Sequence, residues 1–243
     1  LQGLKRLEEA FVSYDQALKI QPDLITAHYN LSLFNLMKGN FKAGWQGYEW
    51  RWLDKDFDSE PLKSANPVWD FKKTNQRLLV WAEMGIGDHI FFGSLLSELL
   101  EDVPNLLVQI DKRLIPIFTR SLPKIKFYPD NFILPESDYD IHVPIGSLGK
   151  YLRNNEKDCE VSRYGFLKDD QVNTSEIKKD LMALNPSNNK ICGISWRSSS
   201  TNTGASQNID LKYLIEMLNL DGYMFVSLQY GETKEEISEV RDE

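Results

Sequence analysis

The chain has 243 residues, of which 42% are apolar and 12% aromatic. This is enough for one or two compact units with hydrophobic cores. It carries 28 Lys and Arg against 36 Asp and Glu, a net charge of −8, and this excess of acid argues against binding along a nucleic acid backbone. No run of about 18 apolar residues occurs, so no membrane-spanning helix is predicted. The two cysteines favour a cytoplasmic location, and no Cys or His pair has the spacing of a metal site.

The first part of the chain has helical periodicity. Residues 4–20 place apolar side chains three and four positions apart, which predicts a helix that ends before Pro22. A second periodic run extends from Thr26 to Gly39, and a third covers residues 41–52. Because all three runs have one apolar face, we expect the helices to pack against one another.

The spacing of small and aromatic residues in these helices matches the second helix of a tetratricopeptide repeat, which has a period of 34 residues. The matching positions are Ala10, Tyr14, Ala17 and Pro22. One period later the pattern predicts a small residue, an aromatic residue and a small residue, where the chain has Gly44, Tyr48 and Arg51. We therefore interpret residues 1–52 as tetratricopeptide-like repeats, with an ordinary helical hairpin as the alternative. Repeats bury their faces on neighbours, so we expect further repeats before Leu1.

A connector over residues 53–75 is followed by alternating strands and helices, which indicates a mostly parallel sheet with crossover helices. We assign residues 76–186 to a first α/β lobe, with strands at 78–81, 106–110, 125–128 and 141–145 and helices at 88–100 and 113–120. We assign residues 187–243 to the first half of a second lobe, with strands at 191–196 and 224–228 and helices at 210–218 and 232–240. The helical stretch at the end stops abruptly, so we read the chain as cut at both ends.

A glycine turn after the first strand is the strongest candidate site. Gly85 and Gly87 precede Asp88 at the start of a helix, where backbone N–H groups and the helix dipole favour an anion. One interpretation is a dinucleotide fingerprint with Asp111 as the ribose-binding acid, but the third glycine is absent. A second is a tight turn with Asp88 as the helix N-cap. The third is a catalytic Asp88. His89 is a candidate on the acceptor side, with a helix-surface histidine as the plainer alternative.

Two strand ends of the second block are weaker candidates. Arg197, Ser198 and Ser199 follow the strand at 191–196, and one guanidinium with several hydroxyl groups suits a diphosphate. An ordinary flexible loop fits these residue types equally well. Gln229 follows the next strand. No Ser-His-Asp or Cys-His arrangement supports nucleophilic catalysis.

Five segments in order give the chain a resemblance to a known family. They are GWQGYEWRW (44–52), LLVWAEMGIGDHIFFGSLL (78–96), DIHVPIGSL (140–148), GISWRSSS (193–200) and FVSLQYG (225–231). Together they resemble bacterial tetratricopeptide-repeat glycosyltransferases of the GT-B type, which are distantly related to heptosyltransferases and O-GlcNAc transferases. The resemblance implies two Rossmann-like lobes, the first contacting the acceptor and the second binding a nucleotide-sugar donor.

The same resemblance implies roles for individual residues. Asp88 would be the general base, and Arg197, Ser198, Ser199 and Gln229 would lie near the donor diphosphate, as would the Gly85–Gly87 turn. The expected reaction is metal-independent transfer, with inversion, of a sugar to a protein or glycan that the repeats recruit. No cofactor is expected besides the donor as substrate. We expect this piece of the chain to be inactive by itself. The alternative is a non-catalytic interaction module, in which the repeats bind a peptide and the α/β part is a degenerate platform.

Overall fold

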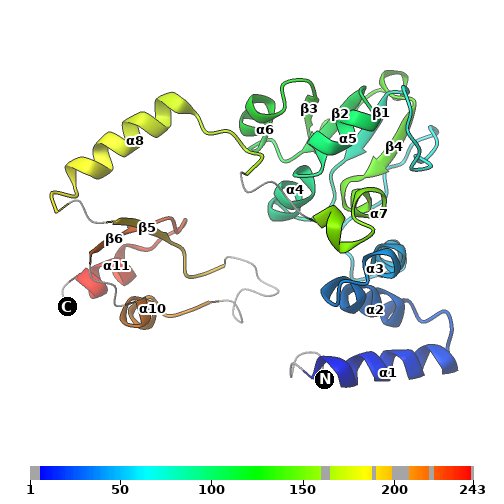
Figure 1. The fold of residues 1–243 in the computed structure, drawn as a ribbon, viewed down its shortest axis with the longest axis horizontal. Coiled ribbons are helices and arrows are strands. Elements are labelled where there is room, and N and C mark those ends of the chain that lie inside the picture. Colours follow the sequence, from blue (N-terminus) through cyan, green and yellow to red (C-terminus); the bar gives the residue numbers. More distant parts are fainter. Residues whose placement is uncertain (1–5, 160–164, 188–189, 199–207, 219–221, 242–243) are drawn as a thin grey trace. The chain divides into compact units, whose positions relative to one another are not determined.

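The computed structural model describes residues 6–159, 165–187, 190–198, 208–218 and 222–241 (Figure 1). The chain forms two compact units, Leu1–Asp169 and Asp170–Glu243. The sequence placed the start of the second lobe at residue 187, whereas the second unit begins at Asp170 and so includes one more helix. None of the described helices is long and apolar enough to cross a membrane.

The first unit begins with the predicted helices. These are α1 (Leu7–Ile20), α2 (Ile25–Met37) and α3 (Phe41–Tyr48), and a 3-10 turn η2 (Glu49–Leu53) continues α3. Helix α2 packs against both α1 and α3. The last predicted helix, 41–52, thus changes to 3-10 geometry at Glu49, and its last turn is tightened.

The repeat pattern accounts for the close contact of α2 and α3. A Cβ atom at Gly44 would lie 2.9 Å from the backbone nitrogen of Leu36, so only glycine fits at this predicted small position. Tyr48, at the predicted aromatic position, is buried. At the third position the guanidinium-bearing side chain of Arg51 is completely buried, where the repeat pattern predicts a small residue. The last repeat is therefore adapted to pack on the α/β part of the chain.

A four-stranded parallel sheet follows in the order β3-β2-β1-β4. Its strands are β1 (Leu78–Trp81), β2 (Leu106–Ile110), β3 (Lys126–Pro129) and β4 (Ile141–Pro144). These bounds agree within one residue at each end with the four predicted strands. Every residue of β1, β2 and β4 is buried, as expected for parallel strands that are covered on both faces.

The two faces of this sheet are covered differently. Helices α4 (Ile86–Gly93), α5 (Leu96–Asp102), α6 (Ile115–Ser121) and α7 (Leu148–Leu152) enclose the larger core on one face, to which α3 also contributes (Figure 1). The other face has a smaller core, built from strand residues and from the loops that contain Leu62, Leu134 and Tyr139. Three short 3-10 turns complete the unit: η3 (Glu136–Asp138), η4 (Ile145–Ser147) and η5 (Glu156–Cys159).

One predicted helix is two helices in the structure. The pattern over 88–100 indicated a single helix, but α4 ends at Gly93 and α5 begins at Leu96. The Ser94 hydroxyl donates to the Phe91 carbonyl at 2.6 Å, and such side-chain bonds compete with the backbone ladder of a helix. Apolar periodicity continues across the break, which is why it escaped the sequence pattern.

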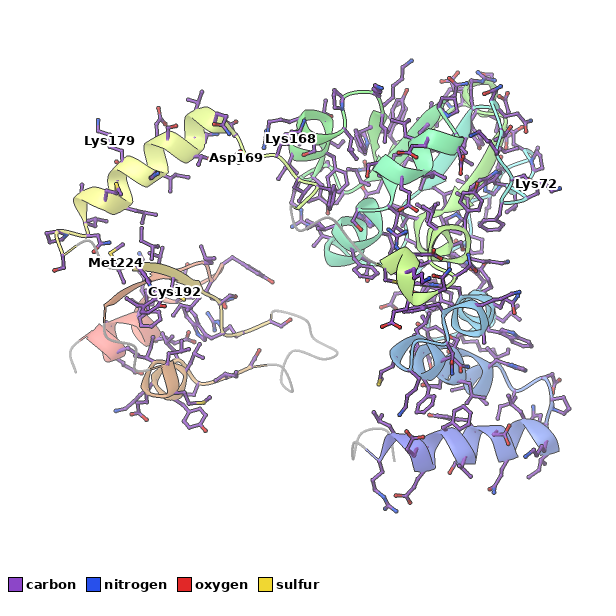
Figure 2. All side chains as sticks on the ribbon, viewed as in Figure 1. Lys72, Lys168, Asp169, Lys179, Cys192 and Met224 are labelled. Carbon is purple, nitrogen blue, oxygen red and sulfur yellow. The ribbon has the colours of Figure 1, made fainter. Side chains whose placement is uncertain are left out.

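The second unit pairs two parallel strands, β5 (Lys190–Ile194) and β6 (Tyr223–Ser227). Helices α10 (Leu211–Leu218) and α11 (Lys234–Arg241) follow these strands, close to the predicted bounds. Helix α8 (Gln171–Ala183) was not predicted, because it buries no residue and so lacks an apolar stripe. Asp170 caps it by accepting from the amides of Val172 and Asn173. Figure 2 marks Lys179 on α8, Cys192 on β5 and Met224 on β6.

Candidate functional site

The first candidate site is the turn between β1 and α4. Gly85 is the residue that caps α4, and Asp88 lies at the third helical position, where its Oδ2 accepts the Gly85 N–H at 3.1 Å. The expected N-cap role of Asp88 therefore belongs to Gly85, and Asp88 accepts the N–H of this N-cap residue from inside the first turn of the helix. Gly87 is exposed, and a Cβ atom there would meet nothing within 4 Å. The start of α4 is thus open to solvent.

Asp88 lines a hollow of about 330 Å³. Its other lining residues are Leu36, Phe41, Trp45, Tyr48, Phe91 and Phe92, which come from α2, α3 and α4. Asp88 is half-buried, is the one charged residue of this lining, and has no ion pair within the described part of the chain. Since Oδ2 is bonded to Gly85, Oδ1 is the oxygen available to a proton donor in the hollow.

A buried ion pair lies at the base of the same turn. Arg51 donates to the Glu83 carboxylate through Nε at 2.9 Å and Nη2 at 2.8 Å, and both side chains are completely buried. Glu83 Oε1 also accepts the Gly146 N–H at 2.7 Å. Burial raises the pKa of the Glu83 carboxyl, and the hydrogen bonds and charge of Arg51 oppose that shift. The pair joins the last repeat to the end of β1.

Aromatic rings complete the surroundings of Arg51. Its guanidinium lies 4.5 Å from the ring centroid of Tyr48 and 4.6 Å from that of Trp52, a distance at which cation–π attraction is substantial. The same guanidinium reaches the Ser147 hydroxyl at 2.9 Å and Glu49 Oε1 at 3.0 Å. Sequence reasoning did not identify this cluster as functional, although Arg51 at a position that should be small was a visible signal.

His89 is inside the protein, and its ring holds the turn. Its Nδ1 accepts the Asp111 N–H at 3.0 Å, so the proton is on Nε2, which donates to the Glu83 carbonyl at 3.1 Å. The side chain is buried, and burial lowers the pKa of the imidazole. Both expectations for His89, an acceptor contact and a helix-surface position, therefore differ from its place in the structure. It connects the end of β1 to the end of β2.

The residue between Glu83 and Gly85 has an unusual backbone. Met84 has φ = 65°, in the left-handed region that non-glycine residues rarely occupy. Its N–H donates to the Ser59 hydroxyl at 2.8 Å, and the Tyr48 hydroxyl donates to its sulfur at 3.3 Å. Contacts from the repeat and the connector thus hold a strained conformation, and such strain concentrates at functional sites.

Asp111 does not have the surroundings of a free ribose-binding acid. Its carboxylate accepts from Arg113 Nε at 2.9 Å and Nη2 at 2.7 Å. These bonds hold the pKa of Asp111 well below its ordinary value. With no third glycine in the turn and its acid already paired, the arrangement does not favour dinucleotide binding.

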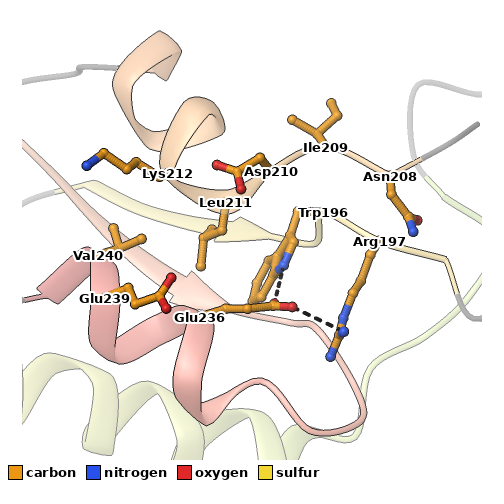
Figure 3. A pocket seen from close by; sticks show the side chains of 10 residues that line it. All are labelled: Trp196, Arg197, Asn208, Ile209, Asp210, Leu211, Lys212, Glu236, Glu239 and Val240. Carbon is orange, nitrogen blue, oxygen red and sulfur yellow. Dashed lines mark hydrogen bonds and ion pairs between the residues drawn. The ribbon is translucent and has the colours of Figure 1, made fainter. Parts of the chain in front are cut away.

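The second candidate site is in the second unit, where a hollow of about 300 Å³ is lined by the residues drawn in Figure 3. Arg197 Nη1 lies 3.1 Å from Glu236 Oε1, and the Trp196 indole donates to Glu236 Oε2 at 2.8 Å (Figure 3). Arg197 also donates to the Glu232 carbonyl. The guanidinium expected to bind phosphate is therefore engaged by a carboxylate.

Gln229 holds the strand end that leads into this hollow. Its Oε1 accepts from the Ser195 hydroxyl and from the backbone amides of Trp196 and Arg197, each at 3.0 Å. Its Nε2 donates to the Arg197 carbonyl at 3.0 Å. The next amide, that of Ser198, donates to Asn208 Oδ1 at 2.8 Å. The amides that would cradle a diphosphate already have partners, and Ser199 lies outside the described residues.

The predicted residues form two groups. Gly85, Gly87, Asp88 and His89 lie together at the start of α4, and Arg197, Ser198 and Gln229 lie together after β5 and β6. In the described ranges no group of three or more His, Cys, Asp or Glu side chains could hold a metal ion.

Comparisons with known proteins agree with part of this description. Residues 4–39 match the TPR repeat family. The chain contains a TPR repeat. It is also 25% identical, over an alignment of 260 residues, to Protein FlbA of Caulobacter vibrioides, covering 99% of this chain and 43% of that protein. The chain thus spans less than half the length of this curated relative. No solved structure matches.

Proposed function

We propose that this chain is part of a glycosyltransferase of the GT-B type, which moves a sugar from a nucleotide-sugar donor to a protein or glycan acceptor. The observation that carries the proposal is the position of Asp88, a carboxylate without an ion pair among the described residues, in a hollow lined by α2, α3 and α4. A TPR repeat is a common platform for protein partners, and residues of α2 and α3 line the hollow, so an acceptor bound to these helices would lie near Asp88.

Asp88 would act as the general base. As the bond between the anomeric carbon and the departing diphosphate breaks, the acceptor hydroxyl attacks that carbon and Asp88 Oδ1 takes the hydroxyl proton. Attack from the face opposite the leaving group inverts the anomeric configuration. The walls of the hollow are mostly apolar. A donor and an acceptor bound against them would displace water from around the reacting hydroxyl, which would favour transfer over hydrolysis of the donor.

The rigid turn would keep this carboxylate in place. The Arg51–Glu83 pair and the ring of His89 fix both sides of the backbone that precedes Asp88. Precise placement of a catalytic group is a large part of its contribution to the rate. The parallel sheet, with the candidate residue in the helix that follows the carboxyl end of β1, supports this assignment.

The second unit would bind the donor. Arg197 would exchange Glu236 for the diphosphate, and Ser198 would contribute its hydroxyl, while Gln229 keeps the backbone of residues 195–197 in position. A diphosphate offers two formal charges to the guanidinium where Glu236 offers one, and guanidinium–phosphate hydrogen bonds are strong, which would favour the exchange. The reaction as proposed uses no metal and no cofactor besides the donor.

Replacing Asp88 by asparagine tests the proposal in the intact protein. Asp88→Asn keeps the size and the Gly85 bond but removes the base, and we expect transfer to fall about 10²- to 10⁴-fold. The measurement uses nucleotide sugars with a radiolabelled sugar and total cell protein as acceptor, together with the affinity for the unlabelled donor. Glu101→Gln, at an exposed position of α5, is the matched control. Unchanged transfer in Asp88→Asn would remove Asp88 from its role.

The alternative function is a non-catalytic interaction module. The TPR match over residues 4–39 supports a peptide or protein partner regardless of any transfer. Under this alternative, Asp88→Asn leaves partner binding intact and no nucleotide sugar is consumed by the wild-type protein. The same experiment therefore separates the two functions.

A further inference from the structure

A larger cavity lies on the opposite face of the sheet from helices α4 to α7. It has a volume of about 610 Å³ and is bounded by β1, β2, the connector around residues 60–63 and the loop of residues 130–136. It shares no lining residue with the hollow of Asp88. The cavity is therefore a site separate from the hollow of Asp88.

A buried glutamine lines this cavity. Gln109 is the one polar residue of β2, where the other four side chains are Leu, Val or Ile. It is 6% exposed, and its Nε2 donates to the Phe132 carbonyl at 2.5 Å. Its Oε1 has no hydrogen-bond partner among the described residues and is not one of their buried unpartnered atoms, so it is accessible. The cavity thus offers a hydrogen-bond acceptor to a donor that enters it.

The rim of the cavity is acidic. Glu60, Asp130 and Glu136 contribute carboxylates and Lys63 one ammonium group, which lies 3.9 Å from Glu60. Asp130 and Glu136 have no ion pair in the described ranges of the chain, although each accepts a backbone N–H. A rim with this excess of negative charge disfavours phosphates, nucleotides and carboxylates and attracts cations.

The floor of the cavity is apolar and partly aromatic. Leu79, Trp81, Leu134 and Tyr139 are all buried and line it. The Trp81 indole N–H is already bonded to His142 at 3.2 Å, so it is not a donor to a ligand. An apolar floor beneath carboxylates suits a cation that also brings an apolar stem.

We propose that this cavity binds an arginine side chain of a polypeptide partner. The guanidinium donates to Gln109 Oε1 and to the rim carboxylate of Asp130 or Glu136, and the methylene stem lies against the apolar lining of the cavity. Arginine fits better than lysine because its planar fork presents several donors at once. The TPR match indicates a protein partner, so we assign the arginine to a polypeptide.

The test uses the full chain, labelled for NMR, and three blocked alanine pentapeptides with arginine, citrulline or glutamate at the centre. Citrulline has the shape of arginine without its charge. We expect the arginine peptide to shift the Trp81 indole and Gln109 side-chain signals, and the other two peptides to shift neither. High salt should weaken binding of the arginine peptide, because the recognition of its charge is electrostatic.

Variants test the two groups of acceptors separately. Gln109→Leu removes the buried acceptor while keeping a side chain that suits the strand, and we expect about ten-fold weaker binding. Asp130→Asn changes a rim residue without removing its bulk, and we expect a loss of about two- to five-fold. Asp88→Asn is the control and should bind the arginine peptide like the wild type.

Three results would overturn the assignment. The first is equal binding of the arginine and citrulline peptides, which would show that the positive charge of arginine does not contribute to binding. The second is a shift of the Trp81 and Gln109 signals by methyl glucoside but not by the arginine peptide, which would make the cavity a sugar site. The third is the absence of any shift with the arginine peptide.

Discussion

The two strand ends that carry the candidate residues are held in opposite ways. After β1, the turn is fixed by Arg51, Glu83 and His89, none of which has a role in the proposed transfer step. After β5, the strand end is held by Gln229 and Arg197, which are themselves the candidates. The first arrangement leaves the Asp88 carboxylate available. In the second, the polar groups of the candidate residues already bond to neighbouring groups of the same unit.

This contrast indicates that available side chains depend on a supporting set of contacts. A reactive group stays free when neighbours supply the hydrogen bonds that fix its backbone. Burial follows the same division. Strands β1, β2 and β4 are buried throughout, whereas neither β5 nor β6 contains a buried residue. Two parallel strands alone do not enclose a core, because parallel strands are stable when both faces are covered.

The largest expected effect comes from breaking the support beneath β1. Arg51→Met leaves Glu83 buried without its partner, and we expect the free energy of unfolding of the first unit to fall by about 3–5 kcal/mol. Denaturant unfolding, followed by the fluorescence of the tryptophans around β1, measures the loss. Hydrogen exchange at the second unit should not change, since the pair lies wholly within the first.

Two variants control this prediction. Arg51→Met combined with Glu83→Met removes both charges, and most of the lost stability should return because no unpaired buried charge remains. Arg77→Met breaks the exposed pair with Asp140, and its effect should be far smaller. A single Arg51→Met variant as stable as the wild type would mean that the pair does not support the turn.

A smaller effect is expected from the corresponding change after β5. Gln229→Leu removes the acceptor for the Trp196 and Arg197 amides, and we expect the local opening free energy of residues 195–197 to fall by about 1–3 kcal/mol. Native-state hydrogen exchange of these amides measures it. Gln229→Glu keeps the acceptor oxygens and loses only the donor, so its protection should be intermediate. Equal exchange in all three proteins would contradict the role given to Gln229.

The smallest expected effect is a pH dependence of stability. It arises at the strand end after β1, where His89 is buried. Burial lowers the pKa of His89, so the unfolded chain takes up a proton at a higher pH than the folded one. Stability is therefore complete above the ordinary histidine pKa of about 6.5 and falls as the pH drops towards the lower folded value. The limiting slope for one proton is about 1.4 kcal/mol per pH unit.

Comparison with His89→Gln isolates this contribution. Glutamine can donate to Glu83 and accept from Asp111 without titrating, so the variant should lose less stability than the wild type between about pH 6.5 and 5. Thermal unfolding at a series of pH values measures the difference. His142, whose pKa burial also lowers, contributes to the slope that remains in the variant. Parallel curves for the two proteins would show that His89 does not titrate differently on folding.

Periodicity alone predicted much of the secondary structure. The helices of the repeat and all six strands are close to their predicted positions, because apolar patterns and turn residues are local signals. Helix α8 and the break between α4 and α5 were missed, the first for want of an apolar stripe and the second because the apolar pattern runs through it. Gly85, Gly87 and Asp88 were identified from the turn pattern, and the structure places them together.

The order of the elements and the acid in the first turn of α4 depend on neighbouring residues in the chain, so the amino-acid sequence specifies both without further information. Which polar groups remain available depends instead on how distant segments pack. Arg51 and Glu83 are 32 residues apart, Gln229 and Arg197 likewise, and Gln109 faces a loop 23 residues away. A hydrogen bond or ion pair requires distances of about 3 Å, and packing sets these distances where spacing along the chain does not.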